Sequence, residues 1–155
     1  MSTITELKDS INTKTVNLVL LTIATGGIYP ILWMYKNCSM LESITKKKIS
    51  DNVFIIWLAV CVGLGGAFTG TGEEALDIIA GLLMIASWVL YIVWSFKAKA
   101  ALQEYALKEH KIDLRMNAFY TFIFTIYYIN YCVNDLPEAK RKQEILSGKP
   151  ATTES

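Results

Sequence analysis

The sequence predicts an all-α integral membrane protein with four hydrophobic helical segments. Of its 155 residues, 53% are hydrophobic, which exceeds the roughly 45–50% found in soluble domains. Charged residues are absent from long stretches, and uncharged apolar runs of about 18 or more residues are typical of transmembrane helices. A soluble helix of this length would normally carry a polar face. The predicted segments cover about residues 16–35, 53–68, 75–96 and 118–133.

Two polar ends flank the predicted membrane domain, residues 15–136. Residues 1–14 predict an N-terminal amphipathic surface segment, which can lie on the membrane or pack on the rest of the protein. Its apolar stripe comprises Ile4, Leu7 and Ile11. At the other end, residues 137–155 are polar and predict a partly disordered tail.

The first hydrophobic segment contains a break near its middle. Two adjacent glycines admit unusual dihedral angles, and the proline disfavours helix at the residue before it. The segment can therefore enter the membrane and turn back, or cross it as a kinked helix. The aromatic residues nearby suit the membrane interface. The candidate kink or re-entrant turn comprises Gly26, Gly27, Tyr29, Pro30 and Trp33.

The second and third segments are the two that we expect to span the membrane. Near the end of the second segment, Gly66 and Gly70 have the spacing of a helix-dimer motif, although clustered glycines equally mark a flexible turn. Asp77 falls in the first turn of the third segment, where a carboxylate stabilises the positive end of a helix. The alternative role for Asp77 is that of an intramembrane proton carrier.

Residues 97–117 predict a basic amphipathic helix on the cytoplasmic side. Its apolar stripe comprises Ala98, Ala101, Leu102, Tyr105, Ile112 and Met116. Such a helix can contact anionic headgroups, or it can be an ordinary solvated helix. The predicted headgroup contacts, which include the basic turn after the first segment, are Lys46, Lys47, Lys48, Lys97, Lys99, Lys111 and Arg115.

The fourth segment is short for a complete span and rich in tyrosine, so it can also dip into the bilayer and return. Several of its polar side chains share one helical face, which can dock a partner or pack within the protein. This candidate interface stripe comprises Tyr120, Tyr127, Asn130, Tyr131 and Asn134.

The basic residues favour an arrangement in which the first and fourth segments return to the side from which they enter. If all four segments crossed, basic loops would lie on both sides of the membrane. If those two segments return, all 15 Lys and Arg residues face one side, in keeping with the preference of basic loops for the cytoplasm.

The first segment also resembles a known family. The block "TIATGGIYPILWMYKN" is similar to the Gly-Ile-Tyr-x-x-Tyr/Trp-Trp-x-Tyr signature of a bacterial family of small membrane proteins, domain of unknown function 4234. The closing "FTIYYINYCVNDLP" resembles the late aromatic segment of that family, and the sequence departs from the signature at Pro30 and Leu32. With the charge distribution, the resemblance implies a multi-pass protein of the bacterial cytoplasmic (inner) membrane with cytoplasmic basic loops. It implies no particular activity.

Reactive side chains do not converge in this sequence, which predicts a protein without catalytic, cofactor-binding or metal-binding residues. His110 is the only histidine, and the three cysteines have neither metal-ligand nor redox-motif spacing. Cys61 and Cys132 lie in apolar runs, where a thiol is usually a small packing residue.

These features predict a non-enzymatic membrane interaction protein. It would bind a membrane-protein partner or a second copy of itself, for example as an immunity-type protein or accessory subunit, and would contact the lipid bilayer and its anionic headgroups but no nucleic acid. One alternative is a membrane-shaping or lipid-binding protein. A second alternative is a small-solute channel or transporter formed by oligomerisation.

Overall fold

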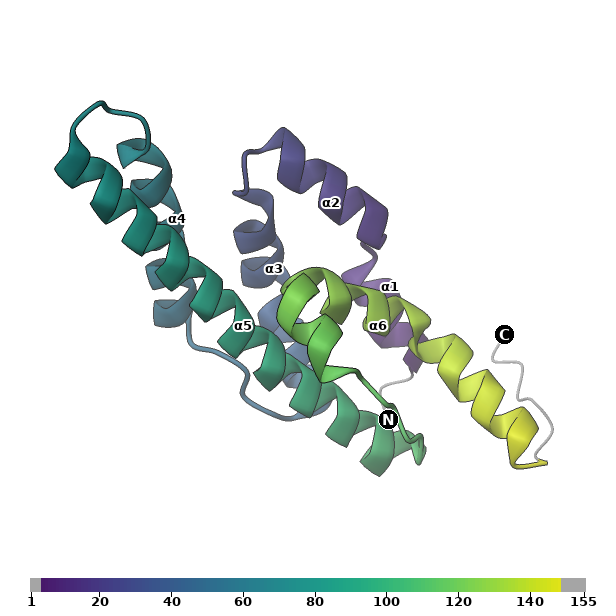
Figure 1. Ribbon diagram of the computed structural model, residues 1–155. Helices are drawn as coiled ribbons and strands as arrows, with labels where there is room; N and C mark the ends of the chain where they lie inside the picture. Colours follow the sequence, from purple (N-terminus) through teal and green to yellow (C-terminus); the bar gives the residue numbers. More distant parts are fainter. Residues whose placement is uncertain (1–3, 149–155) are drawn as a thin grey trace.

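The computed structural model describes residues 4–148, with only the backbone described at position 5 (Figure 1). These residues form helices and contain no strand, as the sequence predicts. In chain order the helices are α1 (Ile4–Ile11), α2 (Thr15–Ala24), α3 (Tyr29–Thr45), α4 (Asn52–Phe68), α5 (Glu74–His110) and α6 (Ala118–Leu146).

The helices α4 and α5 form the long hairpin at the left of Figure 1. Helix α5 has 37 residues, so the third hydrophobic segment continues without interruption into the basic region. The prediction of a helix across residues 97–117 is wrong beyond His110. Lys111 has φ 55° and ψ 33°, the left-handed conformation that commonly ends a helix, and residues 111–117 form a loop.

The first hydrophobic segment is not one helix but a second, shorter helical hairpin, α2–α3. Gly26 and Gly27 have φ values of 60° and 92°, which glycine adopts without steric cost. Helix α3 begins at Tyr29, whose amide donates to Thr25 Oγ1 over 3.0 Å. The expectation that Pro30 keeps Tyr29 out of a helix is wrong, because proline is accommodated in the first turn, where amide hydrogens lack helical partners.

Helix α6 contains a break of the same kind. Thr125 has φ 41° and ψ −116°, so a first part, residues 118–124, and a second part, residues 126–146, meet at an angle. Both this break and the α2–α3 turn follow a short apolar helix.

Within the predicted polar and partly disordered tail, residues 137–146 continue α6 past Pro137. Leu136 is buried just before them. The Gln143 side chain then accepts from the Asp113 amide and donates to the Lys111 carbonyl, both at 3.1 Å. These tertiary contacts hold the polar helix against the loop after α5. The end of the predicted tail, residues 149–155, lies outside the described residues.

The hydrophobic core lies in the basic half of the molecule. Residues Ile4, Leu7 and Ile11 of α1 are buried, and α1 contacts α3 and α6. The predicted amphipathic stripe is buried in the same core, from Ala98 to Met116. Both stripes therefore pack on the rest of the protein.

One helix among the described residues, Glu74–His110, is long and apolar enough by length and composition to cross a membrane. Helix α4 is apolar but has only 17 residues. By length and composition, one of the two helices predicted to span the membrane is therefore long and apolar enough to do so. Only 11% of the apolar window of α5 is buried inside the protein, whereas the core helix of a soluble protein would be covered.

Candidate functional site

Large apolar side chains are exposed on α2, α4, the first half of α5 and the first part of α6. Side chains of these elements that are exposed include Val16, Leu20, Ile23, Val53, Ile56, Trp57, Val60, Ile78, Leu82, Ile85, Trp88, Val89, Phe119 and Ile123. A water-soluble monomer rarely exposes an apolar patch larger than a few hundred Å². Apolar exposure on this scale is typical of surfaces that contact an apolar medium or partner.

Exposure reverses along α5. In its first half the large apolar side chains point outward, and the buried positions there are the small residues Ala80 and Ser87. In its second half Leu102 and Tyr105 are buried, and Lys97 and Lys108 are exposed. One continuous helix thus has an apolar surface in one half and a polar surface in the other.

The hairpin tip beyond the apolar surface carries acidic residues. The Asp77 carboxylate accepts a 2.8 Å hydrogen bond from the Gly70 amide and lies in the first turn of α5. Its position and its bond agree with the predicted structural role of Asp77 at the beginning of α5.

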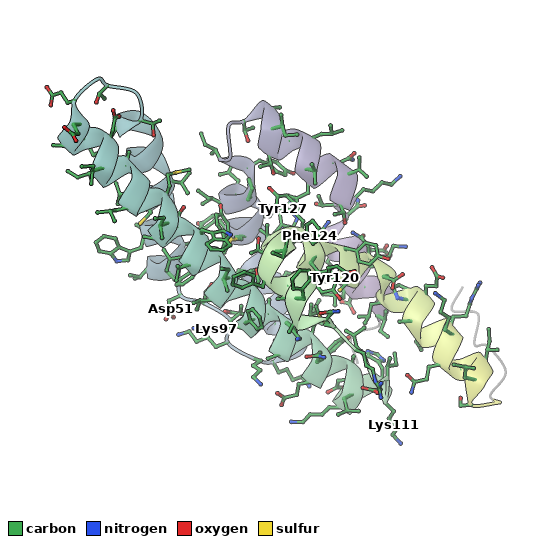
Figure 2. The ribbon with its side chains drawn as sticks, in the orientation of Figure 1. Asp51, Lys97, Lys111, Tyr120, Phe124 and Tyr127 are labelled. Atoms are coloured by element: carbon green, nitrogen blue, oxygen red, sulfur yellow. The ribbon has the colours of Figure 1, made fainter. Side chains whose placement is uncertain are left out.

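Beside this surface, α2 and α6 enclose an open groove with a volume of about 610 Å³. Figure 2 shows three of its aromatic side chains, Tyr120, Phe124 and Tyr127, along the first part of α6 and around its break. The complete lining is Thr15, Val19, Thr22, Ile23, Tyr120, Phe124, Tyr127, Tyr128 and Tyr131. The groove is therefore almost entirely apolar and aromatic, with hydroxyl groups as its polar atoms.

Local interactions hold the aromatic wall in place. The Asn117 side chain accepts from the Phe119 amide over 2.8 Å and caps α6. The Asn117 amide donates to the Tyr128 hydroxyl over 3.0 Å. The rings of Tyr128 and Tyr131 are stacked, with centroids 6.5 Å apart and an interplanar angle of 13°. The break at Thr125 thus brings tyrosines from both parts of α6 to one groove.

The predicted interface stripe is divided in the structure. Tyr120, Tyr127 and Tyr131 line the groove. Asn130 and Asn134 instead each donate a 2.9 Å hydrogen bond to the Thr13 carbonyl. The two asparagines tie the beginning of α2 to α6, so their role is positional.

The opposite wall of the groove is missing from the sequence-based prediction. Thr15, Val19, Thr22 and Ile23 come from α2 and fall at i, i+4, i+7 and i+8, one helical face. That face includes both threonines of α2, which is otherwise aliphatic except for Asn17. This spacing is the signal that could have identified the wall, although nothing in it names α6 as the partner.

The predicted turn residues have separate roles. Gly26 and Gly27 form the turn, whereas Pro30 and Trp33 are buried. Trp33 packs edge-on against Trp94 of α5, with centroids 6.3 Å apart and an interplanar angle of 83°. The interpretation of Trp33 as an interface anchor is therefore wrong, because its ring fixes α3 to α5 inside the core.

Four of the seven predicted headgroup residues form ion pairs within the protein. Lys46 lies 3.7 Å from Glu109, Lys47 pairs with Glu104, and Lys48 pairs with Asp51. In the next region, Arg115 pairs with Asp113 over 3.0 Å. Lys97 and Lys111 are exposed and labelled in Figure 2, and Lys99 is half-buried with its ammonium 5.6 Å from the Phe96 ring centroid.

A carboxylate and a thiol organise the turn between α3 and α4. Glu42 accepts from the amides of Ile49 and Ser50, at 2.7 and 2.8 Å. Burial raises the pKa of the neighbouring Cys38 thiol, which lies 3.1 Å from the Ser50 hydroxyl. A raised pKa keeps the sulfur in its weakly reactive thiol form. All three cysteines, Cys38, Cys61 and Cys132, are free and buried.

Among the described residues, no group of three or more His, Cys, Asp or Glu side chains could hold a metal ion. The chain matches no curated protein and no solved structure. A family model does match residues 13–104, which contain α2, α3, α4 and α5 as far as residue 104. The late aromatic segment lies outside the match. Since the matched range is more than half of the chain, this protein belongs to the family described as Domain of unknown function (DUF4234).

Proposed function

We propose that this protein is a non-enzymatic membrane interaction protein, which inserts the α4–α5 hairpin across the bilayer and binds a membrane-protein partner. An immunity-type protein or an accessory subunit would act in this way. The α2–α3 hairpin and the first part of α6 would enter from the basic side and return to it. The protein would then be a multi-pass component of the bacterial cytoplasmic membrane, with its basic half in the cytoplasm.

The reversal of exposure along α5 carries this proposal. Burying apolar surface is favourable by roughly 25 cal/mol per Å², so the apolar half gains from lipid contact. Most apolar side chains of the polar half of α5 are already buried in the protein core, so this half would gain little by insertion into the membrane. The basic residues of the described chain gather around the polar half of α5, whereas the α4–α5 hairpin tip carries Glu73, Glu74 and Asp77. This distribution agrees with the positive-inside rule.

Helix α4 offers a surface for a partner helix. Gly63 and Gly66 have no neighbouring atom within 4 Å of where a Cβ would lie. Small residues let a second helix approach closely in a membrane. The surrounding exposed side chains of α4, such as Val60 and Leu64, would pack on that helix.

Cysteine labelling from each side of the membrane tests the arrangement. Single cysteines replace Thr71, Lys111, Ser147 or Ile28 in a background without the three native cysteines. We expect positions 111 and 147 to react from one side and position 71 from the other. Position 28, although 56% exposed, should resist a water-soluble reagent. Reaction of positions 111 and 147 from opposite sides would exclude this topology.

Partner binding has its own test. A photo-reactive residue at position 66 should form a cross-link to another membrane protein or to a second copy, and one at Leu107 in the polar half should not. Recovery of an uncross-linked monomer from the native membrane and from several lipid mixtures would contradict partner binding.

The unequal ends of the molecule favour membrane shaping as a second candidate function. Helices α1, α3 and α6 crowd around the basic half, and only the α4–α5 tip extends to the far end (Figure 1). Such a wedge would load area onto one leaflet. It predicts that adding the protein to liposomes changes their shape, and liposomes of unaltered shape at high protein density would exclude it.

A further inference from the structure

We propose that the groove between α2 and α6 binds one acyl chain of an anionic phospholipid, with the ester and phosphate region at the Lys14–Thr15 end. This inference rests on the proposed membrane insertion, because it requires the groove to open into the bilayer. It assigns the groove to a lipid and not to a protein helix.

The lining of the groove matches a hydrocarbon chain. Along α2 it follows one helical face from Thr15 to Ile23, about 12 Å at the helical rise of 1.5 Å per residue. Leu20 and Phe119 flank it and are exposed. In the inserted protein these flanks would contact lipid, so the medium that reaches the groove is itself composed of acyl chains.

The groove also contains hydroxyl groups that need partners. Thr22 donates to the Leu18 carbonyl over 2.7 Å and is satisfied, and Tyr128 accepts from Asn117. The hydroxyls of Tyr120, Tyr127 and Tyr131 form no hydrogen bond with another side chain or backbone group of the described residues. An unpaired hydroxyl in an apolar medium costs free energy. The ester and phosphate oxygens of a phospholipid are acceptors for such groups.

Charge at one end of the groove gives the lipid its orientation and sign. Lys14 is exposed and directly precedes Thr15, and it forms no ion pair with the described residues. Helix α2 begins there without a side-chain cap, so its first amides point toward the same region. A lysine together with the positive end of a helix attracts an anionic phosphate. The opposite end of the groove, near Ile23, has no charged residue.

Native mass spectrometry of the full-length protein tests the site. The protein is reconstituted with equal amounts of phosphatidylglycerol and phosphatidylcholine, and the retained lipid is counted after mild detergent extraction. We expect one phosphatidylglycerol per chain. Val19→Trp should fill the groove and lower retention at least about tenfold, the equivalent of roughly two methylene groups left unburied.

Leu20→Trp is the matched control, because Leu20 is the next residue of α2, is 59% exposed and does not line the groove. It should retain lipid as the wild type does. Lys14→Ala should lower the preference for phosphatidylglycerol over phosphatidylcholine by about fivefold, the effect of one lysine near an anionic surface.

Several outcomes would overturn the acyl-chain site. The first is equal lipid retention by Val19→Trp and Leu20→Trp. The second is a wild-type dimer that dissociates in Val19→Trp, and the third is a wild-type protein without bound lipid. The cysteine-labelling topology is measured on the same samples. If the topology holds and no lipid is retained, the groove inference fails alone. If the topology fails, the proposed membrane function fails first.

Discussion

At the scale of single residues, Thr125 has the least favourable backbone conformation of α6. Its φ of 41° and ψ of −116° lie outside the helical region, and a positive φ is costly for a β-branched residue. The break that Thr125 creates is what turns α6 and completes the aromatic wall of the groove. The surrounding contacts must therefore offset the local strain.

We expect Thr125→Gly to be more stable than Thr125→Ala by about 1 kcal/mol, because both remove the hydroxyl and methyl groups and only glycine also removes the Cβ that makes the conformation strained. In a regular helix the order is reversed, with glycine about 1 kcal/mol worse than alanine. Ile123 lies in such a helix, so Ile123→Gly should be less stable than Ile123→Ala. Unfolding midpoints in detergent measure both differences, and alanine ahead of glycine at both positions would refute the strain.

Asn130 and Asn134 share one acceptor, the Thr13 carbonyl, with 2.9 Å bonds from both. Either asparagine alone keeps that carbonyl paired. The orientation of the Asn130 amide follows from this bond, because a carbonyl can only accept. Its Oδ1 atom is consequently left buried without a partner among the described residues.

The shared acceptor predicts a non-additive double substitution. Asn130→Ala and Asn134→Ala should each destabilise the protein by about 1–2 kcal/mol, and the double variant should exceed their sum by at least about 0.5 kcal/mol. Among the described residues, the Asn37 side chain bonds only to the Trp33 carbonyl of its own helix, at 2.8 Å. Asn37→Ala combined with Asn134→Ala should therefore be additive. Additive unfolding free energies for both pairs would show that Thr13 does not couple the asparagines.

At the scale of elements, the turn between α3 and α4 is held on α5 by ion pairs. Glu104 of α5 accepts from Lys108 of its own helix over 2.7 Å and from Lys47 of the turn. The hydrogen bonds from Lys108 and Lys47 lower the pKa of Glu104 from 4.5 to about 2. Because the pKa is lower in the folded state, ionised Glu104 stabilises that state at pH values above the unfolded-state pKa. This stabilisation is lost when the carboxylate is protonated.

The stabilisation by Glu104 should therefore disappear as the pH falls from about 4.5 to about 2. Glu104→Gln should lower the unfolding midpoint near neutral pH and should match the wild type at the acid end of this window. Glu74→Gln, at the exposed hairpin tip, is the control and should not change the midpoint at either pH. A difference between Glu104→Gln and the wild type that persists at the acid end would exclude the ion-pair origin.

At the scale of the whole molecule, the two halves of α5 should tolerate the same substitution differently. Leu82 and Leu107 are 63% and 59% exposed, in the apolar and polar halves respectively. A lysine in the middle of a membrane helix costs about 2.5–3.5 kcal/mol, whereas a lysine on a solvated surface costs little. We expect Leu82→Lys to reduce the membrane-bound fraction after carbonate extraction and Leu107→Lys to leave it unchanged. Equal tolerance of both variants would argue against insertion of α5.

The sequence by itself determined the helical class, the family, the order of the hydrophobic segments and the separation of basic from acidic ends. Length, periodicity and charge are local properties, and they can be read within one segment. The pair Gly26–Gly27 likewise predicted a break, because positive φ values favour glycine. The break at Thr125 had no such signal, since a β-branched residue does not ordinarily adopt that conformation.

Only the tertiary structure decided what the apolar and polar faces contact. In the structure Trp33 is buried against Trp94, and part of the predicted tail continues α6, where Gln143 contacts the loop after α5. The tyrosines of the predicted stripe line the groove, whereas its asparagines bond to the Thr13 carbonyl. The groove itself needs α2 and α6, whose lining residues lie about a hundred positions apart in the chain. Spacing within a segment shows which side chains share a face, but contacts between distant segments depend on how all the helices pack at once.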